Sequence, residues 1–366
     1  MATLAQLLGA ATLTGVIQGI RGGVPLTGLD PALFTTTARV DGDTAIFHKT
    51  ESTRQTSRRA GYGSQPRARA LVGISQTPTK LIHSFERADH SLTTYMNLTS
   101  FDSPARQEMG RQEVARQTEE FRRLFDNLRV SAVASSLALG AIYFDGDGNL
   151  LPTSSGAVVT VDQGIPAANK TQLNMLGGGS IISASWATAG TDILGQIANI
   201  RSAYIKLTGY ELDTFLYGAN IRNYLLNNTG CAALLQSHGR LAEALAMQEI
   251  PDGFAGVAHW KPADALHFTD QSGTIQSWVG GDVIIGAPKI TREVYELQQG
   301  TYPVPQSVGK VYASPEAALA DVATMEGMFQ FAMAQTAPPT LQHFAGDTFL
   351  PVFKVPKAFI IGDVTP

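Results

Sequence analysis

Residues 104–142 decide the fold: PARQEMGRQEVARQTEEFRRLFDNLRVSAVASSLALGAI reads as one very long helix. Asp102 or Ser103 can cap its N-terminus, and Pro104 fits the first turn because its missing N–H is not needed there. At about 1.5 Å per residue, an unbroken helix of this length would span roughly 58 Å. We therefore expect a helix that extends beyond any single compact lobe.

The two halves of this helix differ in composition. The first half is polar and offers three i,i+4 ion pairs, Arg116 with Glu120, Glu119 with Arg123, and Arg122 with Asp126. The second half is apolar along one side, through Phe121, Leu124, Phe125, Leu128, Val133 and Leu137. One end is expected to project and the other to be anchored in a core. The charged face fits either a solvated helix or a contact with another subunit, and Arg116, Glu119 and Glu120 are our candidate contact residues.

A basic segment precedes the helix. Six basic residues and no acidic one lie between positions 54 and 80, although the whole chain has a net charge of −4; they are Arg54, Arg58, Arg59, Arg67, Arg69 and Lys80. Glycines and prolines interrupt the segment and favour an extended loop. Such a loop is expected to lie on another molecule, either a nucleic acid or a neighbouring subunit. We take these six residues as further candidates for intersubunit contact.

The residues around the loop predict strands. Residues 34–50, FTTTARVDGDTAIFHKT, read as a hairpin turning at Asp41-Gly42. Residues 79–86 alternate in polarity and read as the return strand, with His83 packed rather than reactive. The first twenty residues carry no charge and include a short amphipathic helix. They lack the basic start of a signal peptide and are too polar to span a membrane, so we expect an arm that packs on protein.

The rest of the chain predicts a mixture of helices and strands. We expect helices at 191–207, 239–249 and near 315–325, a strand, turn and helix over 211–230, a strand pair around 271–273, and a closing strand over 349–364. With the long helix and the early strands, this order predicts an α+β fold.

The sequence contains no recognisable catalytic motif. It lacks a nucleophile elbow, a zinc-binding helix and a phosphate loop. Asp145–Asn149, DGDGN, opens like a calcium loop, but Leu150 and Gly156 replace the required glycine and glutamate, so a hairpin turn is expected. Cys231 is expected to be a small buried hydrophobe. We predict no enzyme activity, no catalytic residue, no metal site and no cofactor.

The order of elements resembles the major capsid proteins of tailed bacteriophages with the Hong Kong 97-type fold, and more closely the lambda-type family called major capsid protein E. The similarity is carried by FTTTARV at 34–40, SRRAGYGSQPRARALVGISQTPTKLIHSFE at 57–86, DTFLYGANIRNYLLNN at 213–228 and MFQFAMAQTAPPTLQH at 328–343. The junction between the basic loop and the long helix is its most specific part.

The resemblance implies a division of the chain into parts. These are an N-terminal arm over 1–35, an extended loop (E-loop) over 36–100, a peripheral domain over 101–214 with its spine helix at 104–142, an axial domain over 215–330, and C-terminal strands over 331–366 that return to the peripheral domain.

The resemblance also implies a structural role. Copies of the chain would assemble into pentamers and hexamers of an icosahedral head that encloses double-stranded DNA, held non-specifically on the inner face. A portal protein and a separate scaffolding protein would be the other partners, with a decoration protein as a further candidate. The expected location is the virion capsid, assembled in the bacterial host cytoplasm, with no membrane contact.

Charge supports contact between subunits. The stretch 216–330 has eleven acidic and six basic residues, a net charge of −5, whereas the loop at 54–80 has a charge of +6. A basic loop on a neighbour's acidic surface would gain complementarity. Two alternatives stay open: a nucleic-acid-binding module that uses the basic loop, and a cellular nanocompartment shell of the same fold. The pI near 6.0 and the single loop aromatic, Tyr62, disfavour the first.

Overall fold

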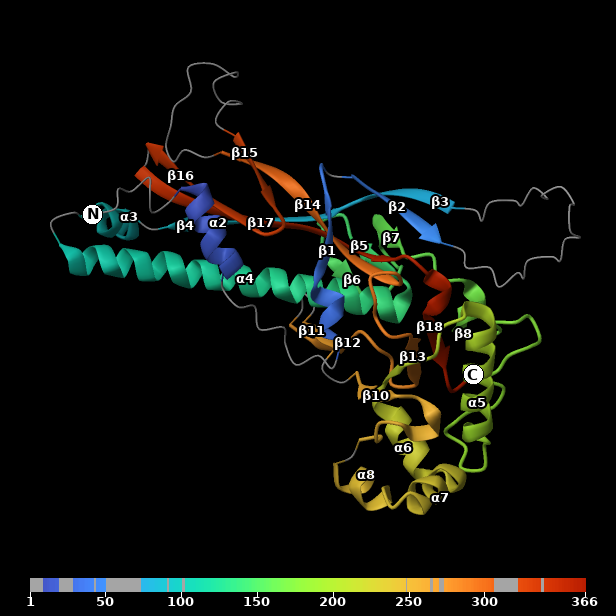
Figure 1. Cartoon of the computed structure of the whole chain (residues 1–366). Helices are drawn as coiled ribbons and strands as arrows, with labels where there is room; N and C mark the ends of the chain where they lie inside the picture. The colour runs from blue at the N-terminus through green and yellow to red at the C-terminus, as the bar shows by residue number, and fades with distance from the viewer. Residues whose placement is uncertain are drawn as a thin grey trace, which may run out of the picture.

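Helix α4 (Pro104–Leu139) runs along one face of a long β-sheet, and a second lobe hangs below its C-terminal end (Figure 1). The computed structural model describes residues 9–19, 29–42, 44–50, 74–90, 92–100, 103–247, 249–263, 266–269, 273–305, 322–336 and 339–366. Helices and strands are mixed throughout, which confirms the predicted α+β class.

The ends of α4 follow from local chemistry. The Ser103 side chain accepts a hydrogen bond from the Arg106 N–H at 3.5 Å, so Ser103 is the N-cap. At the other end Gly140 adopts a left-handed conformation (φ 72°) and terminates the helix. The helix is therefore three residues shorter than the predicted 104–142, and at about 1.5 Å per residue it is roughly 54 Å long.

The upper lobe contains a six-stranded sheet. Its central strand β17 pairs antiparallel with β14 and β16 and with β4, while β1 joins β14 in parallel and β15 pairs with the far end of β14. The strands are β1 (Thr36–Val40), β4 (Ile82–His90), β14 (Tyr295–Pro305), β15 (Val322–Glu326), β16 (Phe329–Thr336) and β17 (Pro339–Phe353).

The N-terminal helix α2 (Ala10–Gly19) covers β16 of its own chain. The Thr14 hydroxyl donates to the Gln330 carbonyl and accepts from the Gln330 N–H, both at 3.1 Å. Arg122 of α4 donates to the Ile17 carbonyl at 3.0 Å, near the C-terminus of α2. Because the helix meets the polar groups of β16 and is anchored to α4, this part of the arm is a fixed element of the subunit.

The hairpin predicted at Asp41-Gly42 is wrong in its pairing. The two strands exist, but β1 pairs with β14, while β2 (Thr44–Thr50) pairs antiparallel with β3 (Ile74–Lys80). The return strand is therefore β3, and β4 after it belongs to the six-stranded sheet. The chain leaves one sheet at the turn and enters a separate two-stranded ribbon.

The lower lobe combines a five-stranded sheet with four helices. The sheet order is β10-β9-β13-β18-β8, with β8 (Lys170–Thr171), β9 (Thr214–Tyr217), β10 (His259–Pro262), β13 (Val283–Ala287) and β18 (Ile360–Asp363). The helices are α5 (Ile193–Thr208), α6 (Ala219–Asn227), α7 (Thr229–Ser237) and α8 (Leu241–Met247). The predicted helices at 191–207 and 239–249 and the predicted strand, turn and helix are confirmed; α7 was not predicted.

The remaining elements are short. One small sheet holds β5 (Ala141–Phe144), β6 (Leu150–Leu151) and β7 (Val159–Asp162), and a ribbon holds β11 (His267–Thr269) and β12 (Ile275–Ser277), which confirms the predicted strand pair. The others are α3 (Leu92–Thr99) and the 3-10 turns η1 (Pro31–Phe34), η2 (Ala167–Asn169), η3 (Phe254–Gly256) and η4 (Pro356–Ala358).

Two predictions near the C-terminus need correction. The part of the predicted 315–325 helix that the structure describes, 322–325, lies in strand β15, because it pairs with residues 302–305 of β14. The single closing strand is in fact two strands in different sheets, β17 and β18, separated by η4 at Pro356. Proline lacks the N–H that a continuous ladder needs.

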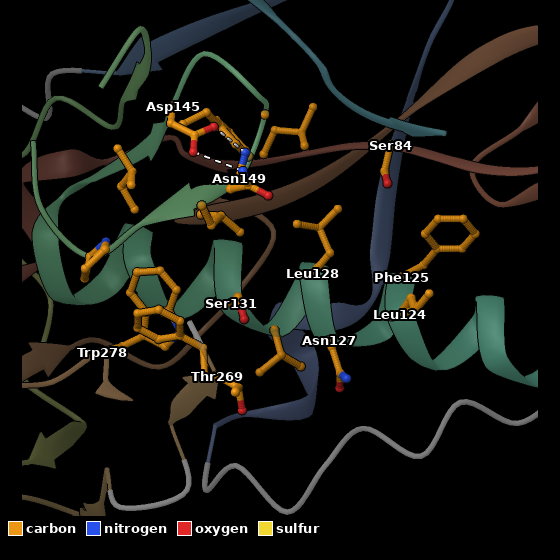
Figure 2. Close-up of a pocket in the computed structure, with 18 of the residues that line it drawn as sticks. Ser84, Leu124, Phe125, Asn127, Leu128, Ser131, Asp145, Asn149, Thr269 and Trp278 are labelled. Atoms are coloured by element: carbon orange, nitrogen blue, oxygen red, sulfur yellow. Dashed lines mark hydrogen bonds between the residues drawn. The ribbon is translucent and has the colours of Figure 1, made fainter. Parts of the chain in front are cut away.

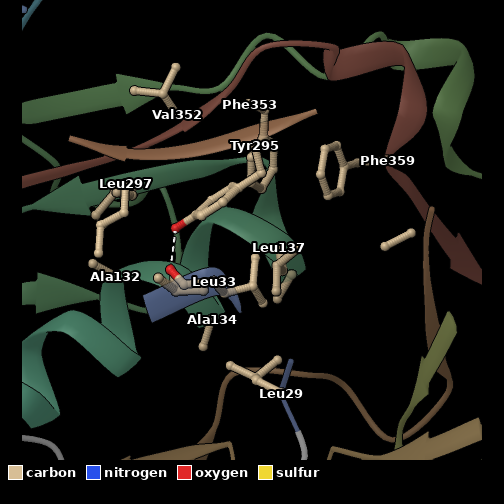
Figure 3. Packing of buried hydrophobic residues seen from close by; sticks show 14 of the residues in the cluster. Leu29, Leu33, Ala132, Ala134, Leu137, Tyr295, Leu297, Val352, Phe353 and Phe359 are labelled. Atoms are coloured by element: carbon tan, nitrogen blue, oxygen red, sulfur yellow. Dashed lines mark hydrogen bonds between the residues drawn. The ribbon is translucent and has the colours of Figure 1, made fainter. Parts of the chain in front are cut away.

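The main core lies where the C-terminal half of α4 meets the sheet (Figure 3). Leu137 of α4 and Phe353 of β17 are both buried there, together with Leu33 of η1. The Tyr295 hydroxyl donates to the Leu33 carbonyl at 2.9 Å, which satisfies the polar group of a buried ring. A second core fills the lower lobe around Tyr204 and Trp186.

Candidate intersubunit surface

The basic segment is only partly visible. Arg54, Arg58, Arg59, Arg67 and Arg69 lie outside the described residues. Lys80 is the last residue of β3 and is exposed. The β2–β3 ribbon that leads to the segment pairs with neither large sheet. Its base packs in the subunit's own core through the buried Ala45 of β2. A two-stranded ribbon is marginally stable in water without such packing, so we expect its far end to contact a partner surface.

The charged half of α4 is largely paired with itself. Arg116 bonds Glu113 at 2.8 Å and approaches Glu120 at 3.7 Å, and its side chain is 60% exposed. The hydrogen bond from Arg116 holds the pKa of Glu113 below its usual range. Of the predicted pairs, Arg116–Glu120 and Arg122–Asp126 form. Glu119 is exposed, and no ion pair joins it to Arg123 within the described part of the helix.

A groove beside α4 was not predicted from the sequence. Its volume is about 930 Å³, and it lies between the middle of α4, strand β4, the β5–β6 hairpin and the β11–β12 ribbon (Figure 2). Asp145 and Asn149 border it on one side and Trp278 on another, and Leu128 and then Leu124 of α4 line it further along the helix. Three stretches of the chain, within 82–86, 124–152 and 267–278, thus shape one surface.

The base of the groove is apolar and includes an unused hydrogen-bond donor. Leu124 is 54% exposed although it belongs to the predicted apolar stripe of the helix. Trp278 stacks on Phe268 with ring centroids 4.2 Å apart. Trp278 is 5% exposed, and its indole Nε1 has no hydrogen-bond partner among the described atoms. A group that supplied an acceptor there would relieve the cost of a buried, unpaired donor.

The charged residues that line the groove are acidic. They are Glu86 of β4 and Asp145 of the hairpin, and no lysine or arginine is among the described residues of the lining. A hydrogen bond from the Asn149 side chain, with others from the backbone, holds the pKa of Asp145 below its usual range. Asp145 therefore stays ionised at neutral pH. The groove suits an extended, basic segment with apolar side chains.

The hairpin that forms one wall has a local cause. Oδ1 of Asp145 accepts from the backbone N–H groups of Asp147 and Asn149 at 2.9 and 2.8 Å, and Gly148 supplies the positive φ (85°) that the turn needs. This confirms the predicted turn at DGDGN. Among the described residues, no group of three or more histidine, cysteine, aspartate or glutamate side chains could hold a metal ion.

Other sequence predictions can be placed. Cys231 is fully buried, as expected, and burial raises the pKa of its thiol to about 12. His83 packs against Tyr302 with ring centroids 4.8 Å apart, in keeping with a packing role. No helix in the described ranges is both long and apolar enough to cross a lipid bilayer.

The sequence held no signal for the groove. Leu124 lies on the apolar side of α4, and Leu128, four residues further on, continues the same stripe. Only the positions of the hairpin and of the β11–β12 ribbon reveal that this side chain stays uncovered.

Comparison with solved structures gives the fold. No known family model matches the sequence, and no curated protein matches it. The chain is similar to a crystal structure assigned to a prophage capsid protein (E. coli CFT073), with a TM-score of 0.54, 12% identity, and coverage of 98% of this chain and 99% of that one. A phage-related protein of Bordetella bronchiseptica RB50 gives a TM-score of 0.48, 12% identity and coverage of 98% and 97%. The mature capsid of bacteriophage PhiM1 gives a TM-score of 0.42 and 10% identity, with coverage of 90% of this chain and 86% of that one. The match to the E. coli CFT073 structure shows that the chain has an α+β capsid-protein fold.

Proposed function

We propose that this chain is the major capsid protein of a tailed bacteriophage, of the lambda-type family with the Hong Kong 97-type fold. Copies of it would assemble as pentamers and hexamers into an icosahedral head around double-stranded DNA. The observation that carries the proposal is the similarity in fold to the E. coli CFT073 prophage protein, which extends over nearly all of both chains.

The two lobes fit the domains of such a subunit. We assign the six-stranded sheet and α4 to the peripheral domain, and the lower lobe to the axial domain. The resemblance places the axial domain at 215–330. Strand pairing favours assigning β14 and β15, which lie within that range, to the peripheral domain instead, because they belong to the sheet that packs on α4. Packing likewise favours moving α5 to the axial side, since its Ile197 and Tyr204 lie in the lower core.

The basic segment and the groove are our proposed intersubunit contact. The β2–β3 ribbon would carry residues 54–73 of one copy to the groove of a neighbour. There the arginines would meet Glu86 and Asp145, and an apolar side chain or backbone carbonyl would reach Leu124 and the Trp278 Nε1. Exposed ion pairs contribute only about 0–1 kcal/mol each, so charge would guide placement. Most of the binding free energy would come from apolar burial repeated over many copies.

The other candidate residues take a secondary part. Lys80 would contact the neighbour at the base of the basic segment. Arg116, Glu119 and Glu120 would lie at the edge of the same intersubunit contact. The further proposed partners are a portal protein, a separate scaffolding protein, a decoration protein and the packaged DNA. The proposed location is the virion, after assembly in the host cytoplasm. No enzyme activity is part of the proposal.

Charge reversal tests this contact. Arg58→Glu with Arg59→Glu should reduce the yield of large particles in velocity sedimentation, with scaffolding protein present, while circular dichroism shows a folded subunit. The matched control is Lys206→Glu with Lys289→Glu, which makes the same change in charge at two exposed positions outside the segment. If both double variants assemble as the parent does, the proposed contact is wrong.

A further inference from the structure

His90 and His343 lie buried where α4 meets the six-stranded sheet. They come from neighbouring strands, with His343 paired to Ala88 and His90 paired to Leu341. Nε2 of His90 is 3.5 Å from Nδ1 of His343, and the ring centroids are 5.5 Å apart. His90 is 6% exposed and His343 1%. Phe121 of α4 meets the His343 ring in a T-shaped contact at 5.7 Å.

The surroundings supply little to balance a proton on this pair. Within the described part of the chain, Nε2 of His343 has no hydrogen-bond partner. Two carboxylates act on His90 through charge, first Glu113 of α4 and then Asp89 of β4. Asp89 is exposed and pairs with Arg87 at 3.3 Å. The sequences of α2 (AATLTGVIQG), α3 (LTTYMNLT) and β16 (FQFAMAQT) contain no acidic or basic residue. A proton added here would place an unpaired charge at a buried interface.

Both imidazoles are held neutral. Burial lowers the pKa of His343 to about 3, with repulsion from His90 as the second cause. Burial also lowers the pKa of His90, although Glu113 and Asp89 oppose that shift. When a histidine is freed from the interface, its pKa returns to about 6.5. The closed state thus binds fewer protons than the open one, so its stability is complete above about pH 6.5 and declines as the pH falls toward 3.

The N-terminal half of α4 is the part that can separate. It is held by two small apolar clusters, one of Leu13, Leu98, Val114, Ala332 and Leu341, and one of Ile17, Phe121, Phe125, Met328 and Ala345. Two hydrogen bonds add to them, from Gln330 to the Thr118 hydroxyl and from Arg122 to the Ile17 carbonyl, both at 3.0 Å. The C-terminal half lies in the main core, and Arg129 ties the boundary between the halves to Asp347 of β17. Regions with few buried apolar contacts open at the lowest free energy.

We propose that His90 and His343 form an acid-sensitive latch, which holds the N-terminal half of α4 on the sheet while neutral and releases it when protonated. The latch belongs to the single subunit. It operates whatever the subunit assembles into, and its failure would leave the proposed function untouched.

Hydrogen exchange tests the latch. Amide exchange of the unassembled full chain is measured at pH 7.5 and 5.0, corrected for the intrinsic effect of pH, for peptides covering 104–121 and 124–139. With pKa values of about 3 closed and about 6.5 released, His343 alone raises the opening equilibrium about 30-fold at pH 5.0 relative to pH 7.5. We expect a rise of this size in 104–121 and a much smaller one in 124–139.

Variants separate the latch from general acid sensitivity. His90→Leu with His343→Leu should abolish the rise, whereas His238→Gln, at an exposed histidine of the lower lobe, should leave it intact. The single variant His343→Gln should remove most of it and serves if the double variant does not fold. Equal protection of 104–121 at both pH values in the parent, or an unchanged rise in the histidine variants, would overturn the proposal.

Discussion

A buried ion pair offers the sharpest test of how the long helix is fixed to the sheet. Arg129 of α4 donates two hydrogen bonds to Asp347 of β17, Nε to Oδ2 and Nη2 to Oδ1, both at 2.6 Å. The Asp347 side chain is fully buried and that of Arg129 is 11% exposed. Asp347→Leu would leave a buried guanidinium without its partner, which costs about 3–5 kcal/mol.

The same change can be expressed as a melting temperature. With an unfolding entropy of about 2.1 cal/mol/K per residue, a loss of 3–5 kcal/mol lowers Tm by about 4–7 °C in a chain of this length. Differential scanning fluorimetry or calorimetry resolves such a shift. The matched control is Arg116→Ala, which breaks only exposed ion pairs and should leave Tm nearly unchanged, because solvent screens such pairs.

A double-mutant cycle then isolates the pair. Arg129→Met with Asp347→Leu removes both charges together and should be less destabilising than either single change, because no buried charge is left unpaired. If the two single losses simply add in the double variant, the two side chains do not interact. Our account of how α4 is fixed at this point would then be refuted.

Two further substitutions test packing and the groove. Gly346→Ala would place a Cβ against the ring of Phe329 and should destabilise the subunit by about 1–3 kcal/mol in thermal unfolding. The control Gly178→Ala adds its Cβ in open space and should leave stability nearly unchanged. Equal effects of the two substitutions would contradict the packing described. Leu124→Asp should lower particle yield in sedimentation without lowering Tm, while Leu176→Asp, at an equally exposed leucine outside the groove, should do neither. Normal assembly of Leu124→Asp would exclude the groove as a contact.

The sequence predicts best what local chemistry controls. Ser103 and Pro104 define the start of α4 through capping and backbone conformation alone, as predicted. Gly140 ends the helix by its left-handed conformation, three residues before the predicted end at 142. The turn at Asp145–Asn149 closes through its own side chains in the same way. These features need no information about distant parts of the chain.

Long-range pairing could not be predicted. The turn at Asp41-Gly42 looked like a hairpin because both flanks are strands, but the partner of β1 is β14, more than 250 residues away. Residues 322–325 favoured a helix by composition and became a strand because β14 offers a free edge. The groove depends on several such long-range placements together, so the exposure of Leu124 could not be read from its helical stripe.

The central claim, that this chain builds an icosahedral shell, is tested most directly by cryo-electron microscopy of the purified protein with its scaffolding protein. Low-resolution images that resolve the spacing of capsomers are sufficient. We predict closed particles whose surface shows clusters with five-fold and six-fold symmetry. A preparation that contains only monomers or small oligomers, with no closed particles, would contradict the claim.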